Sequence, residues 1–184
     1  MSAGEPDRPG APSFPLAILI GPPGAGKTTV GTHLAALLGV SFQDTDASIE
    51  AVAGKPVGEI FIDDGEPAFR EMERSAVKAA IGGADGVVGL GGGAVMDPDT
   101  QAALAGRPVV YLSASFSELA KRVGMDRPRP LLIGNPRAQL KMLLDRRLPV
   151  YEGLAWLTVD TDGREPEVIA GEIAAAIGGQ RPDR

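Results

Sequence analysis

The sequence predicts a three-layer α/β/α fold, in which a central parallel sheet of five strands lies between two layers of helices. Three features indicate it. Five short apolar runs recur along the 184-residue chain, stretches with helical periodicity separate them, and glycine or aspartate follows three of the runs. Short continuous apolar runs are typical of strands buried on both faces, and parallel neighbours must be joined by long crossovers such as helices.

The predicted elements follow one another in a regular order. A strand over residues 16–20 leads through a glycine-rich turn into a helix over 27–38, which Gly39 ends. Ser115 is placed to cap a later helix, and residues 124–135 combine prolines and glycines with few helix formers, so we expect a loop there. The predicted strands are 16–20, 40–45, 87–90, 109–112 and 156–159. The predicted helices are 27–38, 46–53, 58–63, 66–81, 98–104, 115–123, 136–148 and 166–177.

These elements fit one domain over residues 16–178. Residues 1–15 contain four prolines and no Val, Ile or Leu, which predicts a disordered leader without the apolar segment of a secretion signal. We expect residues 179–184 to be frayed.

The composition excludes several kinds of protein. The chain has no cysteine and a single histidine, His33, so disulfides, thiolate zinc sites and multi-histidine metal sites are excluded. No apolar run reaches the roughly 18 residues of a membrane helix. A net charge of -6 and only 4% aromatic residues count against nucleic-acid binding. We therefore expect a cytoplasmic protein with neither a membrane nor a nucleic-acid partner.

A phosphate-binding motif follows the first predicted strand. The sequence from Gly21 to Thr28 matches G-x-x-x-x-G-K-[ST] at every fixed position. Its backbone N–H groups and the following helix bind phosphates, Lys27 reaches the β and γ phosphates, and the Thr28 hydroxyl is a ligand for Mg²⁺. The motif indicates a nucleoside triphosphate site. The predicted contacts are Gly24, Ala25, Gly26, Lys27, Thr28 and Thr29.

Small-molecule phosphotransferases are the favoured class. The chain lacks the N-K-x-D motif of GTPases, and 184 residues leave little room for a mechanical module. At the end of the second strand, one carboxylate of Asp44 and Asp46 could hold Mg²⁺ through water while the other binds an acceptor hydroxyl. The alternative is that Asp46 only caps the following helix.

Two further features suit an acceptor site. Three glycines, Gly91, Gly92 and Gly93, follow the third strand, and close approach to a ligand explains them better than a plain turn. Arg70 lies three residues before Glu73 in a predicted helix, where the two side chains could instead form a surface pair. The segment 121–147 carries eight Lys or Arg against Asp126 and Asp145, which suggests a local anion site and not a general cationic surface. The alternative is a solvated helix face.

Taken in order, these residues resemble the shikimate kinases, a family in the nucleoside monophosphate kinase-like group of P-loop folds. The resemblance spans about residues 16–177. It is carried by Gly21–Thr28, Asp44-Thr45-Asp46, Phe69-Arg70-x-x-Glu73, Gly91–Gly93, Arg129-Pro130-Leu131-Leu132 and Arg147-x-x-x-Tyr151.

The resemblance implies a reaction: ATP transfers its γ-phosphoryl group to the 3-hydroxyl of shikimate, with Mg²⁺ as cofactor, in the pathway to aromatic amino acids. It implies that Asp46 contacts the acceptor and serves as base, and that Asp44 holds Mg²⁺ through water. Arg70 and Arg147 would bind the substrate carboxylate, with Gly91, Gly92 and Gly93 closing the pocket. A guanidinium fork suits a carboxylate, which agrees with these roles.

The resemblance also implies a mobile lid at about residues 123–135, because water must be kept from ATP. Arg129 in that lid would reach the ATP phosphates and act in catalysis, while Arg122 and Arg164 would lie near adenine. The family resemblance implies a monomer. Tyr151 is assigned to the core or the pocket wall, and His33 to an exposed helix face.

Two alternatives remain at this point. A kinase for another polyol acid, such as gluconate, is disfavoured because Arg70, the triple glycine and Arg147 match the shikimate set together. A nucleotide-binding module without turnover would be expected to lack Lys27, Asp46 or Arg129, and all three are present.

Overall fold

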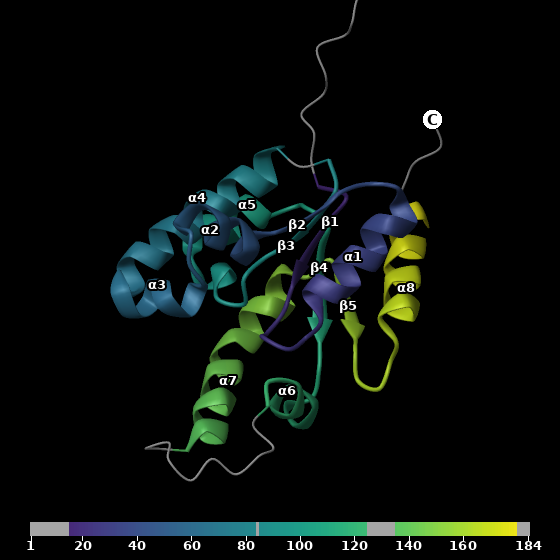
Figure 1. The fold of residues 1–184 in the computed structure, drawn as a ribbon. Helices are drawn as coiled ribbons and strands as arrows, with labels where there is room; N and C mark the ends of the chain where they lie inside the picture. The colour runs from purple at the N-terminus through teal and green to yellow at the C-terminus, as the bar shows by residue number, and fades with distance from the viewer. Residues whose placement is uncertain (1–14, 84, 125–134, 180–184) are drawn as a thin grey trace, which may run out of the picture.

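The sheet of the protein has five parallel strands in the order β2-β3-β1-β4-β5. A computed structural model describes residues 15–83, 85–124 and 135–179 (Figure 1). The strands are β1 (Ala17–Ile20), β2 (Phe42–Asp44), β3 (Val87–Gly89), β4 (Val109–Ser113) and β5 (Leu157–Asp160). The predicted parallel sheet is confirmed, and β3 lies between β2 and β1.

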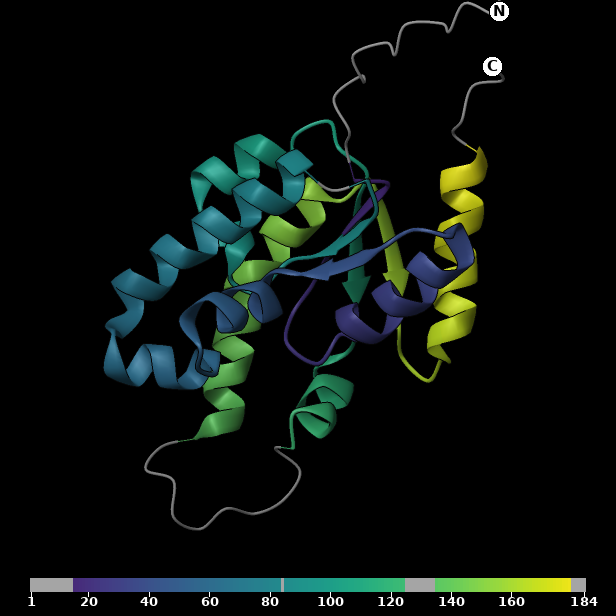
Figure 2. The same ribbon diagram turned by 45° about the horizontal axis from the view of Figure 1, so that its top comes forward.

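Helices cover both faces of this sheet (Figures 1 and 2). One face carries α1 and α8, which pack on each other, and the other carries α4, α5 and α7. The helices are α1 (Lys27–Leu38), α2 (Thr45–Ala53), α3 (Val57–Asp63), α4 (Gly65–Gly83), α5 (Pro98–Leu104), α6 (Phe116–Arg122), α7 (Pro136–Leu154) and α8 (Pro166–Gly179), with a short 3-10 helix η1 (Ala94–Met96).

Strand β1 shows why both faces of the sheet need a cover. Its residues alternate between the two main apolar clusters: Leu19 packs with α1 and α8, whereas Ile18 and Ile20 pack with α4, α5 and α7. All of its side chains are buried. Side chains alternate across a strand, so a strand apolar at every position is stable only between two layers.

A third, smaller cluster lies beside the sheet. Ile49, Ile60 and Phe69 are its buried members. They come from α2, α3 and α4, which lie together at one side of the sheet (Figure 2). This cluster holds the two helices that carry Asp46 and Arg70, so it fixes one side of the site described below.

Helix α7 differs most from its predicted extent. The sequence places its end at Leu148, before Pro149, yet the helix continues to Leu154 with Pro149 inside it. An internal proline costs about 3 kcal/mol because a backbone hydrogen bond is lost. Tyr151 is buried in the cluster on this face, with Val150 and Leu154 packed against it, and this burial holds the last turns in place.

Smaller differences concern one strand end and one short helix. Strand β2 ends at Asp44 and α2 begins at Thr45, one residue earlier than predicted. Helix η1 was not predicted. Most of the predicted leader (1–14), the lid between 125 and 134, and 180–184 of the tail lie outside the described residues. Within the described part of the chain, no helix is both long and apolar enough to span a bilayer.

Candidate active site

The three chemically distinctive strand ends lie on neighbouring strands. The phosphate loop follows β1, Asp44 ends β2, and the triple glycine follows β3, which separates the other two strands in the sheet. Asp44 is in register with Gly89 of β3. In parallel sheets ligands bind at the carboxyl ends of the strands, so this topology brings the predicted residues to one edge.

The phosphate loop depends on glycine at two positions. Gly24 and Gly26 have φ values of 84° and 91°, a left-handed conformation that other residues rarely adopt. Gly26 is the N-cap of α1, and Lys27 is the first residue of that helix. The loop therefore leads directly into a helix N-terminus, where backbone N–H groups and the helix dipole favour phosphate.

The ammonium group of Lys27 lies over this loop. Its Nζ donates to the carbonyl oxygens of Gly21 at 2.8 Å and Pro22 at 3.1 Å. Desolvation lowers the pKa of Lys27 to about 8, although the carboxylates of Asp46 and Asp44 act in the opposite direction.

Asp44, and not Asp46, caps helix α2. Its Oδ1 accepts from the backbone N–H groups of Asp46 at 3.0 Å and Ala47 at 3.4 Å, while its Oδ2 accepts from the Thr28 hydroxyl at 2.7 Å. The alternative that Asp46 is the cap is therefore wrong. The two residues predicted to serve the metal, Thr28 and Asp44, are in direct contact.

The Asp46 carboxyl group is half-buried next to the glycine segment. Burial raises its pKa, the negative charge of Asp44 raises it further, and Lys27 opposes both effects. A raised pKa makes a carboxylate a better proton acceptor.

Each of the three glycines lies against a residue of the site. None has a positive φ, so backbone conformation does not require glycine there. A Cβ at Gly91 would clash with Oδ1 of Asp46, and one at Gly92 would lie 3.0 Å from Cδ of Pro23 in the phosphate loop. At Gly93 a Cβ would lie 2.8 Å from Nη1 of Arg70 and 3.3 Å from Nη2 of Arg147. Close approach of these protein residues therefore accounts for the triple glycine, and close approach to a ligand stays a prediction.

Arg70 is held by two carboxylates and two rings. Its Nη1 pairs with Glu73 at 2.6 Å, its Nη2 pairs with Glu66 at 3.2 Å, and its guanidinium carbon lies 5.4 Å from the centre of the Phe69 ring. Arg70 and Glu73 do form a pair, but Glu73 is only 4% exposed, so the alternative that they pair on the surface is wrong. Because these contacts already fix the Arg70 side chain, little further side-chain entropy is lost when its guanidinium group binds a ligand.

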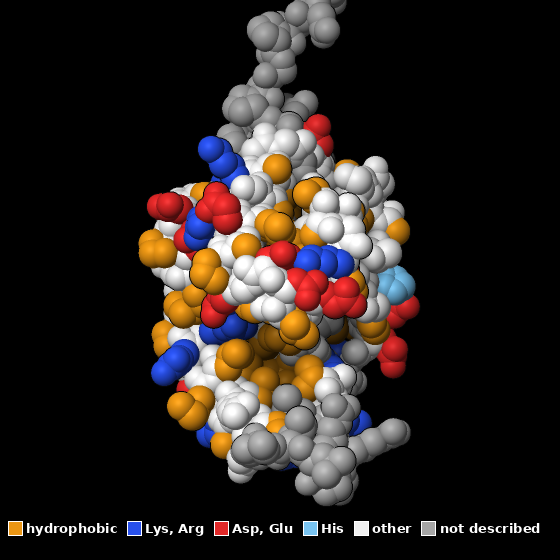
Figure 3. Space-filling view, turned by 60° about the vertical axis from the view of Figure 1, so that its left-hand side comes forward, with side chains coloured by type: hydrophobic (Ala, Val, Ile, Leu, Met, Phe, Trp, Pro, Cys, Tyr) orange, Lys and Arg blue, Asp and Glu red, His pale blue; other side chains and the backbone are white. Residues whose placement is uncertain are grey.

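Arg147 approaches the same glycines from α7. Its Nη1 donates to the carbonyl oxygen of Gly92 at 2.9 Å. The structure thus brings Arg70 and Arg147, predicted as a pair, together next to Gly93. Each also borders a hollow, of about 340 Å³ beside Arg70 and about 370 Å³ beside Arg147. Figure 3 shows that the face carrying α3 is hollowed and that hydrophobic side chains line this hollow.

A larger cavity of about 710 Å³ lies along the phosphate loop. It is lined by Asp44 and Asp46 and by eight of the nine predicted ATP contacts, the ninth being Arg129, which lies outside the described residues. Those eight are Gly24, Ala25, Gly26, Lys27, Thr28, Thr29, Arg122 and Arg164. The volume is within the usual range for small-molecule sites.

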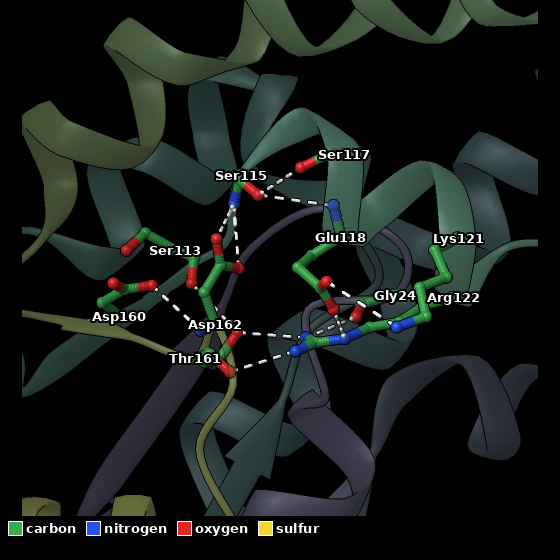
Figure 4. A network of polar contacts seen from close by, with 10 residues as sticks. All are labelled: Gly24, Ser113, Ser115, Ser117, Glu118, Lys121, Arg122, Asp160, Thr161 and Asp162. Carbon is green, nitrogen blue, oxygen red and sulfur yellow. Dashed lines mark hydrogen bonds and ion pairs between the residues drawn. The ribbon is translucent and has the colours of Figure 1, made fainter.

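Arg122 joins the phosphate loop to the loop after β5 (Figure 4). Its Nη1 donates to the Gly24 carbonyl at 3.2 Å and to the Thr161 hydroxyl at 3.1 Å, and its Nη2 donates to the Thr161 carbonyl at 3.0 Å. Asp162 accepts from the backbone N–H of Ser115 at 3.1 Å, which attaches the same loop to the start of α6. Arg164 donates to the Asp160 carbonyl at 2.9 Å.

The sequence reasoning missed two residues in this region and underrated a third. Thr161 is 2% exposed and organises Arg122, and the only sign of it was its place at the end of a strand. Thr45 is fully buried and accepts a hydrogen bond from the Gly91 N–H at 2.9 Å, although it stood only between two aspartates in the sequence. Tyr151, assigned to the core or pocket wall, also binds the glycine segment.

The first strand of this parallel sheet leads into a phosphate loop, and an acidic pair follows the end of β2. Two arginines from α4 and α7 meet at the glycine segment after β3. This arrangement defines a P-loop kinase. Comparison with known proteins identifies the kind. The family model described as "Shikimate kinase" matches residues 23–178, and the chain belongs to the shikimate kinase family.

Individual relatives agree with this family. The shikimate kinase of Salinispora arenicola is 57% identical over 163 residues, which are 89% of this chain and 98% of that one. That of Thermobifida fusca is 58% identical over 168 residues, with the same shares covered. Among solved structures, a shikimate kinase from Acinetobacter baumannii in complex with shikimate has a TM-score of 0.83 at 35% identity, covering 94% of this chain and 97% of that one.

Proposed function

We propose that this chain transfers the γ-phosphoryl group of ATP to the 3-hydroxyl of shikimate, giving shikimate 3-phosphate and ADP. One observation carries the proposal: the triple glycine brings Asp46, Arg70 and Arg147 around one segment that also touches the phosphate loop. An acceptor bound there lies beside the γ-phosphate position. The two arginines beside the bound acceptor favour an acceptor that carries a carboxylate over a neutral alcohol.

Arg70 and Arg147 are assigned to the shikimate carboxylate. Their guanidinium nitrogens lie against Gly93, and Glu73 and Glu66 hold Arg70 from behind. Gly91, Gly92 and Gly93 would let the acceptor ring approach the backbone closely, since any side chain there would meet the site residues or the phosphate loop. The carboxylate would thus fix the direction from which the ring enters.

Asp46 is assigned as the group that orients the acceptor hydroxyl and takes its proton. Phosphoryl transfer has a loose transition state, so the proton leaves late and orientation matters most. The raised pKa of Asp46 suits a proton acceptor. Lys27 and the loop backbone are assigned to the ATP phosphates, where Lys27 stabilises the charge that develops during transfer.

The residues present fit Mg²⁺ at the phosphate end of the cavity. Thr28 and Asp44 offer oxygen atoms 2.7 Å apart, and oxygen is the ligand that Mg²⁺ prefers. Among the described residues no group of three or more His, Cys, Asp or Glu could hold a metal, so phosphates and water must complete the shell. We assign Thr28 as a direct ligand and Asp44 as a ligand through water. The ion would neutralise charge on the ATP phosphates.

Arg122 and Arg164 are assigned to the adenine side of the cavity, because both line it beyond the phosphate loop. Arg129 is proposed as a further catalytic contact to the phosphates, and it lies outside the described residues. We place the whole reaction in one domain, residues 16–178.

The proposal is tested by ADP release from Mg·ATP, measured with and without shikimate, with gluconate as a parallel control. We expect stimulation by shikimate alone. Stimulation by gluconate instead would assign the site to another polyol acid. ATP binding without stimulation by either compound would leave a nucleotide site and overturn the acceptor assignment.

Arg70→Ala tests the carboxylate assignment, with Arg74→Ala as the matched control one turn later on α4. Arg74 pairs with Glu71 on the surface and is not assigned to substrate. Loss of charge-assisted hydrogen bonds should raise KM for shikimate about 10- to 100-fold in Arg70→Ala while KM for ATP stays within about twofold. Arg74→Ala should change neither value. Equal rises in both KM values for Arg70→Ala would show a structural role.

A further inference from the structure

We propose that Thr45 and Tyr151 are positioning residues, whose buried hydroxyls hold the triple glycine at the Gly91 N–H and at the Gly92 carbonyl and thereby set the geometry of the acceptor site. The inference rests on the proposed function and deepens it. Three successive glycines have no side chains to fix them and the greatest backbone freedom of any residue. The turn that follows binds two of their carbonyls, since Gly91 and Gly93 accept from the N–H groups of Ala94 and Met96, each at 3.0 Å. The Gly91 N–H and the Gly92 carbonyl are held by side chains of other elements.

Thr45 fixes the first glycine. Its hydroxyl oxygen accepts from the Gly91 N–H at 2.9 Å, and the residue is fully buried. Its neighbour in sequence, Asp46, stands so close to the same glycine that a Cβ there would clash with Oδ1. The start of α2 thus contacts Gly91 through two consecutive residues, and a shift of Gly91 changes the space at the Asp46 carboxylate.

Tyr151 fixes the second glycine. Its hydroxyl donates to the Gly92 carbonyl at 2.6 Å, and Arg147, one helical turn earlier on α7, donates to the same oxygen at 2.9 Å. Tyr151 is 1% exposed, and its ring stacks on Tyr111 with centroids 5.2 Å apart. This packing fixes the ring and its hydroxyl. The hydroxyl in turn fixes the Gly92 carbonyl oxygen, to which Arg147 also donates.

The hydrogen bonds of Thr45 and Tyr151 affect the acceptor site more than the nucleotide site. The guanidinium groups of Arg70 and Arg147 both lie against Gly93, the next residue, so a displaced segment changes the position of both relative to Asp46. Gly92 also touches Pro23, but the phosphate loop has its own restraints in the two bonds from Lys27. Loss of either hydroxyl should therefore weaken shikimate binding and leave ATP binding nearly unchanged.

Four variants of the full chain test this, with both substrates varied in steady-state assays. Tyr151→Phe and Thr45→Val each remove a hydroxyl and keep the shape of the side chain. Thr45→Ser restores the hydroxyl, and Tyr111→Phe removes the hydroxyl of the stacked ring. Since a lost hydrogen bond corresponds to a change of about 3- to 10-fold, we expect that rise in KM for shikimate in the first two variants only. KM for ATP should stay within about twofold in all four.

Other outcomes overturn the inference. A structural role predicts lower thermal stability with both KM values unchanged or raised together, and a Thr45→Ser variant as impaired as Thr45→Val would exclude the hydroxyl as the cause. If either Tyr151→Phe or Thr45→Val does not fold, KM for shikimate in the other variant decides the test. A wild-type protein that shikimate does not stimulate would refute the proposed function itself, whereas an active wild type with unaltered KM for shikimate in both hydroxyl variants refutes only this inference.

Discussion

Three consecutive residues, from the end of β2 into the start of α2, have three different roles in the site. Asp44 caps α2 and accepts a hydrogen bond from the Thr28 hydroxyl. Thr45 accepts a hydrogen bond from the Gly91 N–H, and Asp46 faces the glycine segment. Because Asp44 accepts the hydrogen bonds from the first N–H groups of α2, the carboxyl group of Asp46 is not needed as a cap. The role of a residue here follows from its place relative to the strand end, since Asp44 and Asp46 are chemically alike.

Asp46→Asn tests this division. The amide has the same shape but cannot take a proton, so turnover should fall about 100-fold or more while the dissociation constant for ATP changes less than about threefold. Coupled ADP assays and calorimetric titration with ATP give the two values. The control is Glu50→Gln, another carboxylate bordering the same cavity, which should keep its turnover. A near-normal rate in Asp46→Asn would mean that another group orients the acceptor.

Tyr151 provides a test of pH dependence. Burial raises its pKa to about 12 and also raises that of Tyr111, the other tyrosine of the chain. An unfolded tyrosine ionises near pH 10, so Tyr151 favours the folded state below that pH, and this contribution is lost as pH rises through about 12. In Tyr111→Phe, absorbance at about 295 nm should show one phenol with a midpoint near 12 when folded and near 10 in urea. A midpoint near 10 in the folded protein would contradict the burial of the Tyr151 hydroxyl.

At the scale of elements, two glycines inside helices have opposite roles. A Cβ at Gly31 of α1 would clash with the Phe42 ring, and a Cβ at Gly89 of β3 would also lie only 3.1 Å from that ring. A Cβ at Gly171 of α8 would meet nothing within 4 Å. Glycine at the first position allows α1 to pack closely on β2, whereas at the second it only weakens the helix.

The expected effects of alanine at these two positions are therefore opposite. Gly31→Ala should lower the free energy of unfolding by about 1–3 kcal/mol, because overpacking outweighs the gain in helix propensity. Gly171→Ala should raise it by up to about 1 kcal/mol. Urea denaturation measures both. A stabilised Gly31→Ala would mean that Phe42 can move aside and that α1 and β2 are loosely packed.

The sequence predicted most elements because their signals are local, and it failed where distant contacts decide. The apolar run of β1 and the glycine-rich loop after it are local signals, and both were placed correctly. The end of α7 was wrong because Pro149 signals a helix end locally, while the burial of Tyr151 depends on residues far away in sequence. Glu73 was taken for a surface residue because its burial depends on how α4 packs.

At the scale of the whole molecule, the glycine segment lies between two parts whose apolar clusters differ in size. On one side are the phosphate loop, α1 and α8, which pack on the sheet through a large apolar cluster. On the other are α2, α3 and part of α4, which share a cluster with only three buried members, Ile49, Ile60 and Phe69. A small cluster gives a low free energy of local opening, so this side should open more easily than the sheet.

Hydrogen exchange of the free protein should follow this division, with amides of α3 exchanging well before those of β1 and β4. Because Arg70 and Asp46 both belong to the easily opened side, shikimate at about 100 times its dissociation constant should slow exchange in α2–α4 by up to about 100-fold. Mg·ADP should instead protect residues 24–28 and the loop at Thr161. Uniform protection by either ligand, or α3 amides as slow as those of β1, would show that the protein opens only as one unit.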